Sequence, residues 1–211
     1  MVRDFLEKQK NFLFNTLEKE IKDRRVLDAM KQIPREEFIP KGLKELAYID
    51  SPLDIGHDQT ISQPYVVALM CEMLELKESD KVLDIGTGSG YLAAILSKLC
   101  KEVVTVEIVP EFVDKAKERF KELEYTNITA VQGDGNLGCP EMAPYDKIVC
   151  SAFVKDIPSN WREQITKGGV IVAPLEKGDT QELVRVRYMD DRYFEEYFGA
   201  VTFVPLVSAK E

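Results

Sequence analysis

The sequence predicts an α/β protein with a doubly wound, mostly parallel β-sheet, antiparallel strands at its C-terminal end and a helical N-terminal cap. From residue 81 onward, short apolar runs rich in β-branched residues alternate with amphipathic helical patterns. This alternation is typical of a parallel sheet with helices on both faces. Residues 1–50 show helical spacing only, and the last strand-like runs have no helical pattern between them, which favours antiparallel pairing there.

The N-terminal segment predicts two helices. Apolar residues recur at helical spacing from Phe5 to Ile21, and a second, shorter stripe runs from Val26 to Met30. Residues 50–62 contain Pro and Gly without periodicity, so we expect a loop there. A helix over 63–76 should follow, with its proline in the first turn, where proline is tolerated.

The remaining elements alternate along the chain. Strands are predicted over 81–85, 103–106, 128–131, 148–152 and 170–173, and helices over 89–100, 110–123 and 158–166. Three further strands are predicted over about 182–189, 192–198 and 200–207. No repeat or low-complexity linker divides the chain, so we expect one domain, residues 1–211, with residues 1–50 as its cap.

The composition argues against several classes of protein. The 211-residue chain has a formal net charge of −9 and a pI near 4.9, so it lacks the surplus of positive charge on which nonspecific nucleic-acid binding depends. Its longest clean apolar run, Val66 to Cys71, is far shorter than the roughly 20 residues of a membrane-spanning helix, and its charged start is unlike a signal peptide. We expect a cytoplasmic protein with no nucleic-acid or membrane partner; the sequence leaves the oligomeric state open.

Cysteine and histidine usage argues against metal chemistry. The four cysteines form no CxxC pair and are expected to be reduced and packed as small apolar side chains. His57 is the single histidine, so a site built from several imidazoles is excluded, and a Ser-His-Asp triad would have to use this residue. We therefore predict no metal site and disfavour hydrolases.

The sharpest signal is the string VLDIGTGSGY, residues 82–91, in which a buried strand leads through three alternating glycines into a helix. Glycines at this point let the backbone approach a ligand closely at the carboxyl end of the sheet. The spacing is GxGxG, whereas dinucleotide-binding proteins usually show GxGxxG. The loop therefore predicts a cofactor crevice and disfavours a nicotinamide-dependent oxidoreductase.

Two carboxylates follow the next two strands. Glu107 lies 21 residues after Gly86, near the roughly 20 expected of an acid that accepts both ribose hydroxyls. Asp134 lies between two glycines, where its carboxylate could accept the exocyclic amine of an adenine. Taken singly, Glu107 could be a solvated strand-end acid and Asp134 an Asx-turn residue. Together with the glycine loop they predict a nucleoside ligand without phosphate.

The sequence resembles the S-adenosylmethionine-dependent methyltransferases through the strings VLDIGTGSGY, VVTVE and GDG. It is similar in particular to the protein-L-isoaspartate O-methyltransferases, whose longer strings cover roughly residues 25 to 207. These strings are RVLDAMKQIPREEFIP, IGHDQTISQPYVVALM, GDGNLGCPEMAPYDKI, ITKGGVIVAPL and VTFVPL. The resemblance implies a Rossmann-like fold and methyl transfer to the α-carboxylate of L-isoaspartyl residues in damaged proteins, which initiates repair.

The resemblance also implies roles in binding the cofactor, S-adenosyl-L-methionine. Four loop residues would wrap its methionine part: Gly86, Thr87, Gly88 and Gly90. Asp84 would lie beneath its ammonium group, and Glu107 would bind the ribose. Asp134 would bind the adenine edge, with Gly135 adjoining.

For the substrate, the resemblance implies that the string Thr60, Ile61 and Ser62 closes over the cofactor and meets the acceptor, with Ser62 as the catalytic residue and Val204 holding the substrate backbone. An α-carboxylate, with a reference pKa of about 3.5, is ionised at neutral pH and needs no general base to attack a sulfonium methyl. Ser62 would then orient the acceptor as a hydrogen-bond donor. Its alternative role is that of a helix N-cap before Gln63.

The chain departs from the family pattern at three positions. Asp54 and Asp58 stand in the loop where the family typically has Pro and Gly, and Phe153 stands in a run usually rich in Ala. Like charges close together are unfavourable, so two acids beside a site for an anion put the acceptor in question. The alternatives left open are a methyltransferase with a different acceptor and a non-catalytic cofactor-binding adaptor on the same fold.

Overall fold

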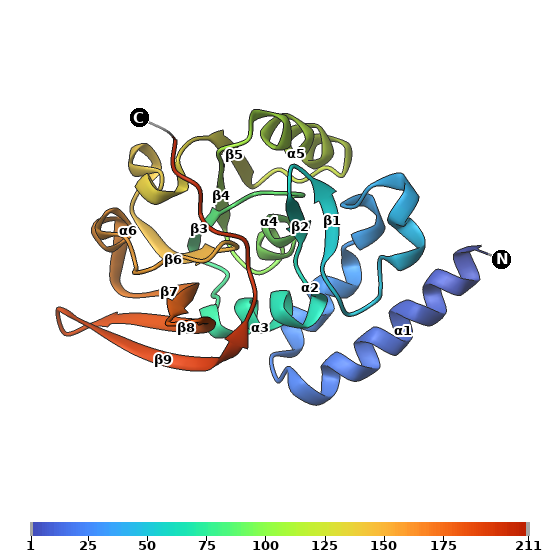
Figure 1. Ribbon diagram of the computed structural model, residues 1–211, viewed down its shortest axis with the longest axis horizontal. Helices are drawn as coiled ribbons and strands as arrows, with labels where there is room; N and C mark the ends of the chain where they lie inside the picture. The colour runs from blue at the N-terminus through green and yellow to red at the C-terminus, as the bar shows by residue number, and fades with distance from the viewer. Residues whose placement is uncertain (1, 210–211) are drawn as a thin grey trace.

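The computed structural model describes residues 2–209. Its main sheet consists of β3 (Lys81–Ile85), β4 (Glu102–Glu107), β5 (Ile128–Gln132), β6 (Tyr145–Cys150), β7 (Ile165–Lys177), β8 (Thr180–Met189) and β9 (Arg192–Val201). The strand order is β5-β4-β3-β6-β7-β8-β9, in which β3 to β7 are parallel and β8 and β9 pair antiparallel (Figure 1). This confirms the predicted fold class.

The helices lie before and between these strands. They are α1 (Val2–Glu20), α2 (Arg24–Gln32), α3 (Pro64–Leu74), α4 (Tyr91–Ser97), α5 (Pro110–Glu122) and α6 (Ser159–Gln164), with short 3-10 turns η1 (Arg35–Glu37), η2 (Lys41–Leu46), η3 (Gly135–Leu137) and η4 (Pro140–Met142). Both α3 and α5 begin with proline, whose missing N–H costs nothing in a first turn. In α5 an acid in the first turn and basic residues in the last complement the helix dipole.

Side chains of the sheet alternate between two apolar clusters, as the period of a strand dictates. Val82 and Val103 belong to the cluster that includes residues of α1 to α5. Leu83 and Val104 belong to the other cluster, which includes Trp161 of α6. The central strands are therefore covered on both faces, which explains why they read as continuous apolar runs.

The N-terminal cap shares the core of the sheet. Leu17 of α1 and Leu27 of α2 are buried in the same cluster as Val82 of β3. This shared core supports the proposal that residues 1–211 form one domain. No helix within residues 2–209 is long and apolar enough to cross a membrane.

Two predictions for the irregular regions were wrong. The loop expected over 50–62 contains an antiparallel hairpin of β1 (Leu53–Gly56) and β2 (Gln59–Ile61). Its turn residues, His57 and Asp58, both have positive φ, as a type I′ turn requires. Such a turn usually carries Asn-Gly, so His-Asp is no clear signal for it.

The strand predicted over 200–207 is also absent, because β9 ends at Val201. The backbone of Phe203 pairs with the side chain of Gln181, whose amide donates to the Phe203 carbonyl and whose oxygen accepts from the Phe203 N–H. Pro205 makes only an isolated bridge with Phe153. A proline lacks the N–H of a regular ladder, and the backbone of Phe203 pairs with a side chain instead of a strand, so β9 does not continue. Residues 202–209 therefore run as an irregular segment beyond the sheet (Figure 1).

Candidate active site

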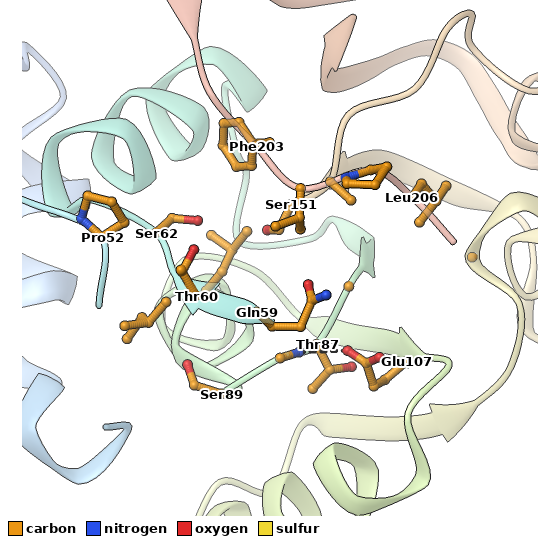
Figure 2. A pocket seen from close by; sticks show the side chains of 18 of the residues that line it. Pro52, Gln59, Thr60, Ser62, Thr87, Ser89, Glu107, Ser151, Phe203 and Leu206 are labelled. Atoms are coloured by element: carbon orange, nitrogen blue, oxygen red, sulfur yellow. Dashed lines mark hydrogen bonds between the residues drawn. The ribbon is translucent and has the colours of Figure 1, made fainter. Parts of the chain in front are cut away.

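A cavity of about 950 Å³ lies at the carboxyl ends of β3, β4 and β6. The chain places β4 and β5 on one side of β3 and β6 on the other, so the strand order reverses between β3 and β6. In open α/β sheets this reversal is where ligands bind. The hairpin and the segment after β9 form the other walls (Figure 2).

The predicted site residues gather mainly around this cavity. Those that line it are Thr60, Ile61, Ser62, Gly86, Thr87, Gly88, Glu107, Gly135 and Val204. Three others, Asp84, Gly90 and Asp134, lie outside the lining. Each of these three residues makes contacts within the protein that explain its position behind or beside the cavity.

The glycine loop is held by the neighbouring strand. The N–H groups of Gly86 and Thr87 both donate to the carbonyl of Val106, at 2.9 and 3.3 Å. Gly86 and Gly88 have positive φ, and a Cβ on Gly88 would lie 3.5 Å from Ile55 of the hairpin. Glycine therefore adopts the positive φ that the turn requires, and its lack of a side chain leaves space for a ligand.

Gly90 serves packing. It has a φ of 84° at the start of α4, and a Cβ there would lie 2.8 Å from the Phe120 ring of α5. Because a contact this short requires something to move, a larger residue would displace the Phe120 ring and would also strain the positive-φ backbone. Gly90 therefore lets the two helices pack closely behind the cavity.

Glu107 braces the loop and faces the cavity (Figure 2). Its Oε2 accepts from the Gly88 N–H at 2.9 Å, and its Oε1 accepts from the Val109 N–H at 3.0 Å. Each oxygen keeps a further lone pair, so the carboxylate can accept two more hydrogen bonds from a ligand. The side chain is thus fixed in place by the backbone on either side of it.

Asp84 is fully buried beneath the loop. Its Oδ2 accepts from the Thr105 hydroxyl at 2.8 Å, and the Thr105 hydroxyl lies 2.6 Å from that of Thr87. Its Oδ1 has no partner among the described residues. Burial raises the pKa of Asp84 to about 7, the Thr105 hydrogen bond opposes this rise, and Glu107 adds to it. A buried carboxyl oxygen without a partner fits a cationic ligand group.

Asp134 contributes chiefly to local structure. Its Oδ1 accepts from the backbone and side chain of Asn136, at 2.8 and 2.9 Å, and its Oδ2 accepts from the Ala209 N–H at 2.9 Å. Partial burial opposes ionisation, but these hydrogen bonds lower the pKa of Asp134. The carboxylate thus stays an acceptor while it caps η3 and holds the C-terminal segment. The adjoining Gly135 lines the cavity, and a Cβ there would lie 2.6 Å from Ile85.

Ser62 follows β2 and has its hydroxyl directed into the cavity (Figure 2). The N-cap of α3 is Gln63, and no side chain caps it from that position. Instead the Asp50 carboxylate accepts from the backbone N–H of Tyr65 at 2.8 Å and from the side-chain amide of Gln63 at 3.0 Å. The alternative role of Ser62 as N-cap was therefore wrong, because Asp50 satisfies the helix start.

Val204 lies in the segment after β9. Its carbonyl accepts from the Phe153 N–H at 2.9 Å, and the Leu206 N–H donates to the Phe153 carbonyl. The segment is thereby held along the cavity by backbone pairing. Phe153 makes these contacts but does not line the cavity, so its bulk is not presented to a ligand there.

The two acidic departures differ. Asp54 is exposed, lies outside the lining and accepts from the Gly56 N–H at 2.6 Å, so it stabilises the hairpin turn. Asp58 lines the cavity at the hairpin tip and has a φ of 56°, a conformation that glycine adopts more readily. Only Asp58 remains a candidate for repelling an anionic acceptor.

Sequence reasoning missed several lining residues, among them Gln59, Ser151 and Phe203 (Figure 2). Ser151 directly follows β6, and its N–H donates to the Ile85 carbonyl at 2.9 Å. The strand order would have indicated it, because residues after two strands that flank a reversal meet at one edge. Gln59 and Phe203 belong to the hairpin and the irregular segment, neither of which was predicted.

A glycine loop at the reversal point, an acid at the end of the next strand and an unpartnered buried carboxyl oxygen fit S-adenosylmethionine. Fold and cavity together define a Rossmann-like S-adenosylmethionine-dependent methyltransferase. The family model for protein-L-isoaspartate(D-aspartate) O-methyltransferase matches residues 7–211. The chain belongs to this family: it transfers methyl groups from S-adenosylmethionine to L-isoaspartyl residues in damaged proteins, initiating repair.

Individual relatives agree with this assignment. The chain is 48% identical over 186 residues to a protein-L-isoaspartate O-methyltransferase of Dictyoglomus turgidum, covering 88% of this chain and 84% of the relative. It is 46% identical over 201 residues to that of Methanoculleus marisnigri, covering 95% and 91%.

Two solved structures are similar throughout most of the chain. One, a protein-L-isoaspartate O-methyltransferase, matches with a TM-score of 0.83 and 31% identity over 93% of this chain and 65% of its own, so the chain spans slightly less than two thirds of that protein. The other, a candidate enzyme of the same kind from Plasmodium falciparum in complex with S-adenosyl-L-homocysteine, matches with a TM-score of 0.83 and 26% identity over 94% and 98%.

Proposed function

We propose that the cavity at the carboxyl ends of β3, β4 and β6 is where this methyl transfer takes place. The single observation that carries the proposal is the convergence there of the glycine loop, Glu107 and the Ser62 hydroxyl from separate parts of the chain. In this proposal Gly86, Thr87 and Gly88 wrap the methionine part of the cofactor, and Asp84 pairs with its ammonium group. Glu107 accepts the ribose hydroxyls.

The adenine edge is assigned to Asp134, with Gly135 adjoining. Asp134 keeps lone pairs beyond its three protein hydrogen bonds, and an ionised carboxylate is a good acceptor for an exocyclic amine. Gly90 is assigned a supporting role, since its contact with Phe120 sets how closely α5 lies behind the loop.

On the acceptor side, Thr60, Ile61 and Ser62 form the wall opposite the glycine loop, and Val204 holds the peptide backbone. Bound S-adenosylmethionine supplies an electrophilic methyl group on a sulfonium sulfur. The residues of the chain need to align the ionised α-carboxylate and shield it from water, since the carboxylate needs no general base. Such alignment alone can contribute on the order of 7 kcal/mol to lowering a barrier.

Methyl transfer from labelled S-adenosylmethionine to matched isoaspartyl and aspartyl peptides tests the function. We expect incorporation into the isoaspartyl peptide only, with the label in a base-labile ester. Equal labelling of both peptides, or labelling of neither with intact cofactor binding, would favour another acceptor or a non-catalytic adaptor.

The ribose assignment predicts that Glu107→Ala weakens S-adenosylmethionine binding by about 1.5 to 3 kcal/mol, the range for hydrogen bonds to a charged group. The variant also frees the N–H groups of Gly88 and Val109, so calorimetry should be accompanied by thermal unfolding. A folded variant with unchanged affinity for S-adenosylmethionine would contradict the assignment of Glu107 to the ribose.

The acidic hairpin tip predicts that Asp58→Gly lowers the KM for isoaspartyl peptide at low ionic strength, because it removes a negative charge beside an anionic acceptor. The benefit should shrink as salt screens the tip. Asp54→Asn is the matched control, since it removes a charge from the same hairpin outside the cavity lining and keeps an oxygen that can accept from the Gly56 N–H. An effect below about twofold without salt dependence means that Asp58 does not influence the acceptor.

We also propose that the enzyme works in the cytoplasm on isoaspartyl proteins and peptides, without nucleic-acid or membrane partners. The four cysteines are free and buried, which suits a reducing compartment. The net charge of −9 is consistent with the absence of a nucleic-acid partner.

A further inference from the structure

Arg35, in the turn η1, is a fully buried cation next to the acceptor wall. Its Nη2 donates to the Ser62 carbonyl at 2.8 Å, and its guanidinium lies over the Tyr91 ring at 4.8 Å from the ring centre. Its Nε and Nη1 have no partner among the described residues. The hydrogen bond to Ser62 is therefore its main polar contact with the rest of the chain.

Such an arrangement is costly for the folded protein. Arginine remains protonated in proteins, and burying a charge is unfavourable unless it is paired or fully hydrogen-bonded. Among residues 2–209 Arg35 forms no ion pair: burial lowers its pKa, and the charge of Asp50 opposes this only from beyond ion-pair distance. An apolar side chain of similar size would fill this place at lower cost, so the guanidinium needs an explanation other than stability.

The carbonyl that Arg35 holds belongs to the residue whose hydroxyl enters the cavity. Asp50 holds the next residue, Gln63, and the start of α3. The junction between β2 and α3 is thus fixed from two directions. Ile61, before Ser62, is held by the pairing of β2 with β1, so the Arg35 contact is what fixes the carbonyl of Ser62 itself between these two anchored neighbours.

We propose that Arg35 is a positioning residue for the acceptor: it fixes the backbone of Ser62 and so holds the Ser62 hydroxyl where the acceptor carboxylate is received. This inference rests on the proposed role of Ser62. Arg35 acts on the acceptor only through Ser62, because its hydrogen bond within the described residues goes to the Ser62 carbonyl. Its contribution should therefore depend on the hydroxyl that it positions.

The test is a double-mutant cycle with Arg35→Met, which keeps the volume but removes the donor, in the wild-type and Ser62→Ala backgrounds. We expect Arg35→Met to lower kcat/KM for isoaspartyl peptide at least tenfold in the wild type. In the Ser62→Ala background the further loss should be less than twofold, because no hydroxyl remains to be positioned. Affinity for S-adenosyl-L-homocysteine, measured by calorimetry, should change less than threefold.

Arg25→Met is the control. Arg25 also donates to a backbone carbonyl of a distant residue, Leu76 at 3.0 Å, but it lies away from the cavity. Turnover of this variant should stay within twofold of wild type. Arg35→Lys retains the charge and a group that can donate to the Ser62 carbonyl, so it should fold even if Arg35→Met does not, with a smaller loss that again disappears in the Ser62→Ala background.

Equal losses in both backgrounds, or a parallel loss of cofactor affinity, would overturn the inference, because a purely structural role acts regardless of Ser62. A Ser62→Ala variant with normal turnover would instead overturn the proposed role of Ser62, and this inference with it. The Ser62→Ala single variant therefore separates the two failures.

Discussion

Asp84→Asn should make the cofactor-free protein more stable and bind the cofactor less tightly. Asp84 is fully buried, its Oδ1 has no partner among the described residues, and burial raises its pKa to about 7. Replacing the carboxylate by an amide removes a charge that the empty site must keep out of water. The same change removes the anion that would pair with the cofactor ammonium group, a loss of about 1.5 to 3 kcal/mol.

The expected gain in stability of Asp84→Asn over the wild type depends on pH and is largest at high pH. The pKa of Asp84 is higher in the folded protein than in the unfolded chain, so the folded state binds its proton more tightly. The free energy of unfolding therefore falls as pH rises from about 4 to about 7 and then levels off. Because a tenfold change in proton affinity corresponds to about 1.4 kcal/mol, the full penalty is on the order of 4 kcal/mol.

Thermal unfolding and calorimetry check both parts. At pH 8 the cofactor-free Asp84→Asn protein should unfold at a higher temperature than wild type, and the difference should vanish near pH 4. The affinity of the wild type for S-adenosyl-L-homocysteine should weaken below about pH 7, as Asp84 takes up a proton, whereas that of the variant should not follow this titration.

Asp80→Asn is a matched control at the opposite end of β3. Asp80 is also buried, but its carboxylate accepts from the Lys77 N–H at 2.9 Å and lies 4.0 Å from the Lys147 ammonium. Because its charge is paired, the amide should lower stability and leave cofactor affinity unchanged. If Asp84→Asn behaves like Asp80→Asn in both measurements, Asp84 is structural and its assignment to the cofactor fails.

The sequence predicted the sheet and the cofactor side of the cavity well because these depend on local, periodic signals. The glycine loop follows a continuous apolar strand, and Glu107 ends the next one, so parallel topology alone brings them to one edge. Alternating apolar runs fixed the faces of β3 and β4 in the same way.

The acceptor side was harder to predict because it depends on contacts between distant parts of the chain. The hairpin turn at His57 and Asp58 lacks the usual glycine, and Phe203 is held by the side chain of Gln181. Arg35 directly precedes two acidic residues, Glu36 and Glu37, yet it is fully buried and donates to the Ser62 carbonyl. None of these contacts leaves a periodic pattern.

Asp134 and Gly90 show a further limit. The sequence suggested a ligand role for both, and the structure gives each a contact within the protein: Asp134 caps η3, and Gly90 packs against Phe120. The spacing of such a residue predicts where it lies in the fold. It does not predict how many of its hydrogen bonds are made within the protein, and so how many lone pairs remain for a ligand; that requires the three-dimensional structure.

Ser62→Ala should lower kcat for isoaspartyl peptide by roughly 10- to 100-fold, with cofactor affinity nearly unchanged. The range corresponds to the loss of one hydrogen bond to a charged group, about 1.5 to 3 kcal/mol. Ser62 has no capping role, because Gln63 is the N-cap and Asp50 satisfies the start of α3, so the variant should fold normally. The measurement is steady-state kinetics with peptide and cofactor varied separately.

Ser62→Asp tests whether Ser62 acts by orienting the acceptor carboxylate or only by placing a polar group in the cavity. The new carboxylate would lie beside the acceptor carboxylate, and repulsion between like charges should reduce turnover below that of Ser62→Ala. Ser97→Ala is the control. Within residues 2–209 the Ser97 hydroxyl bonds only to the Ala94 carbonyl of α4, away from the cavity, so its loss should leave turnover within about twofold. Near wild-type turnover in Ser62→Asp would mean that the acceptor carboxylate does not approach this hydroxyl, and the role proposed for Ser62 would then fail although the residue lines the cavity.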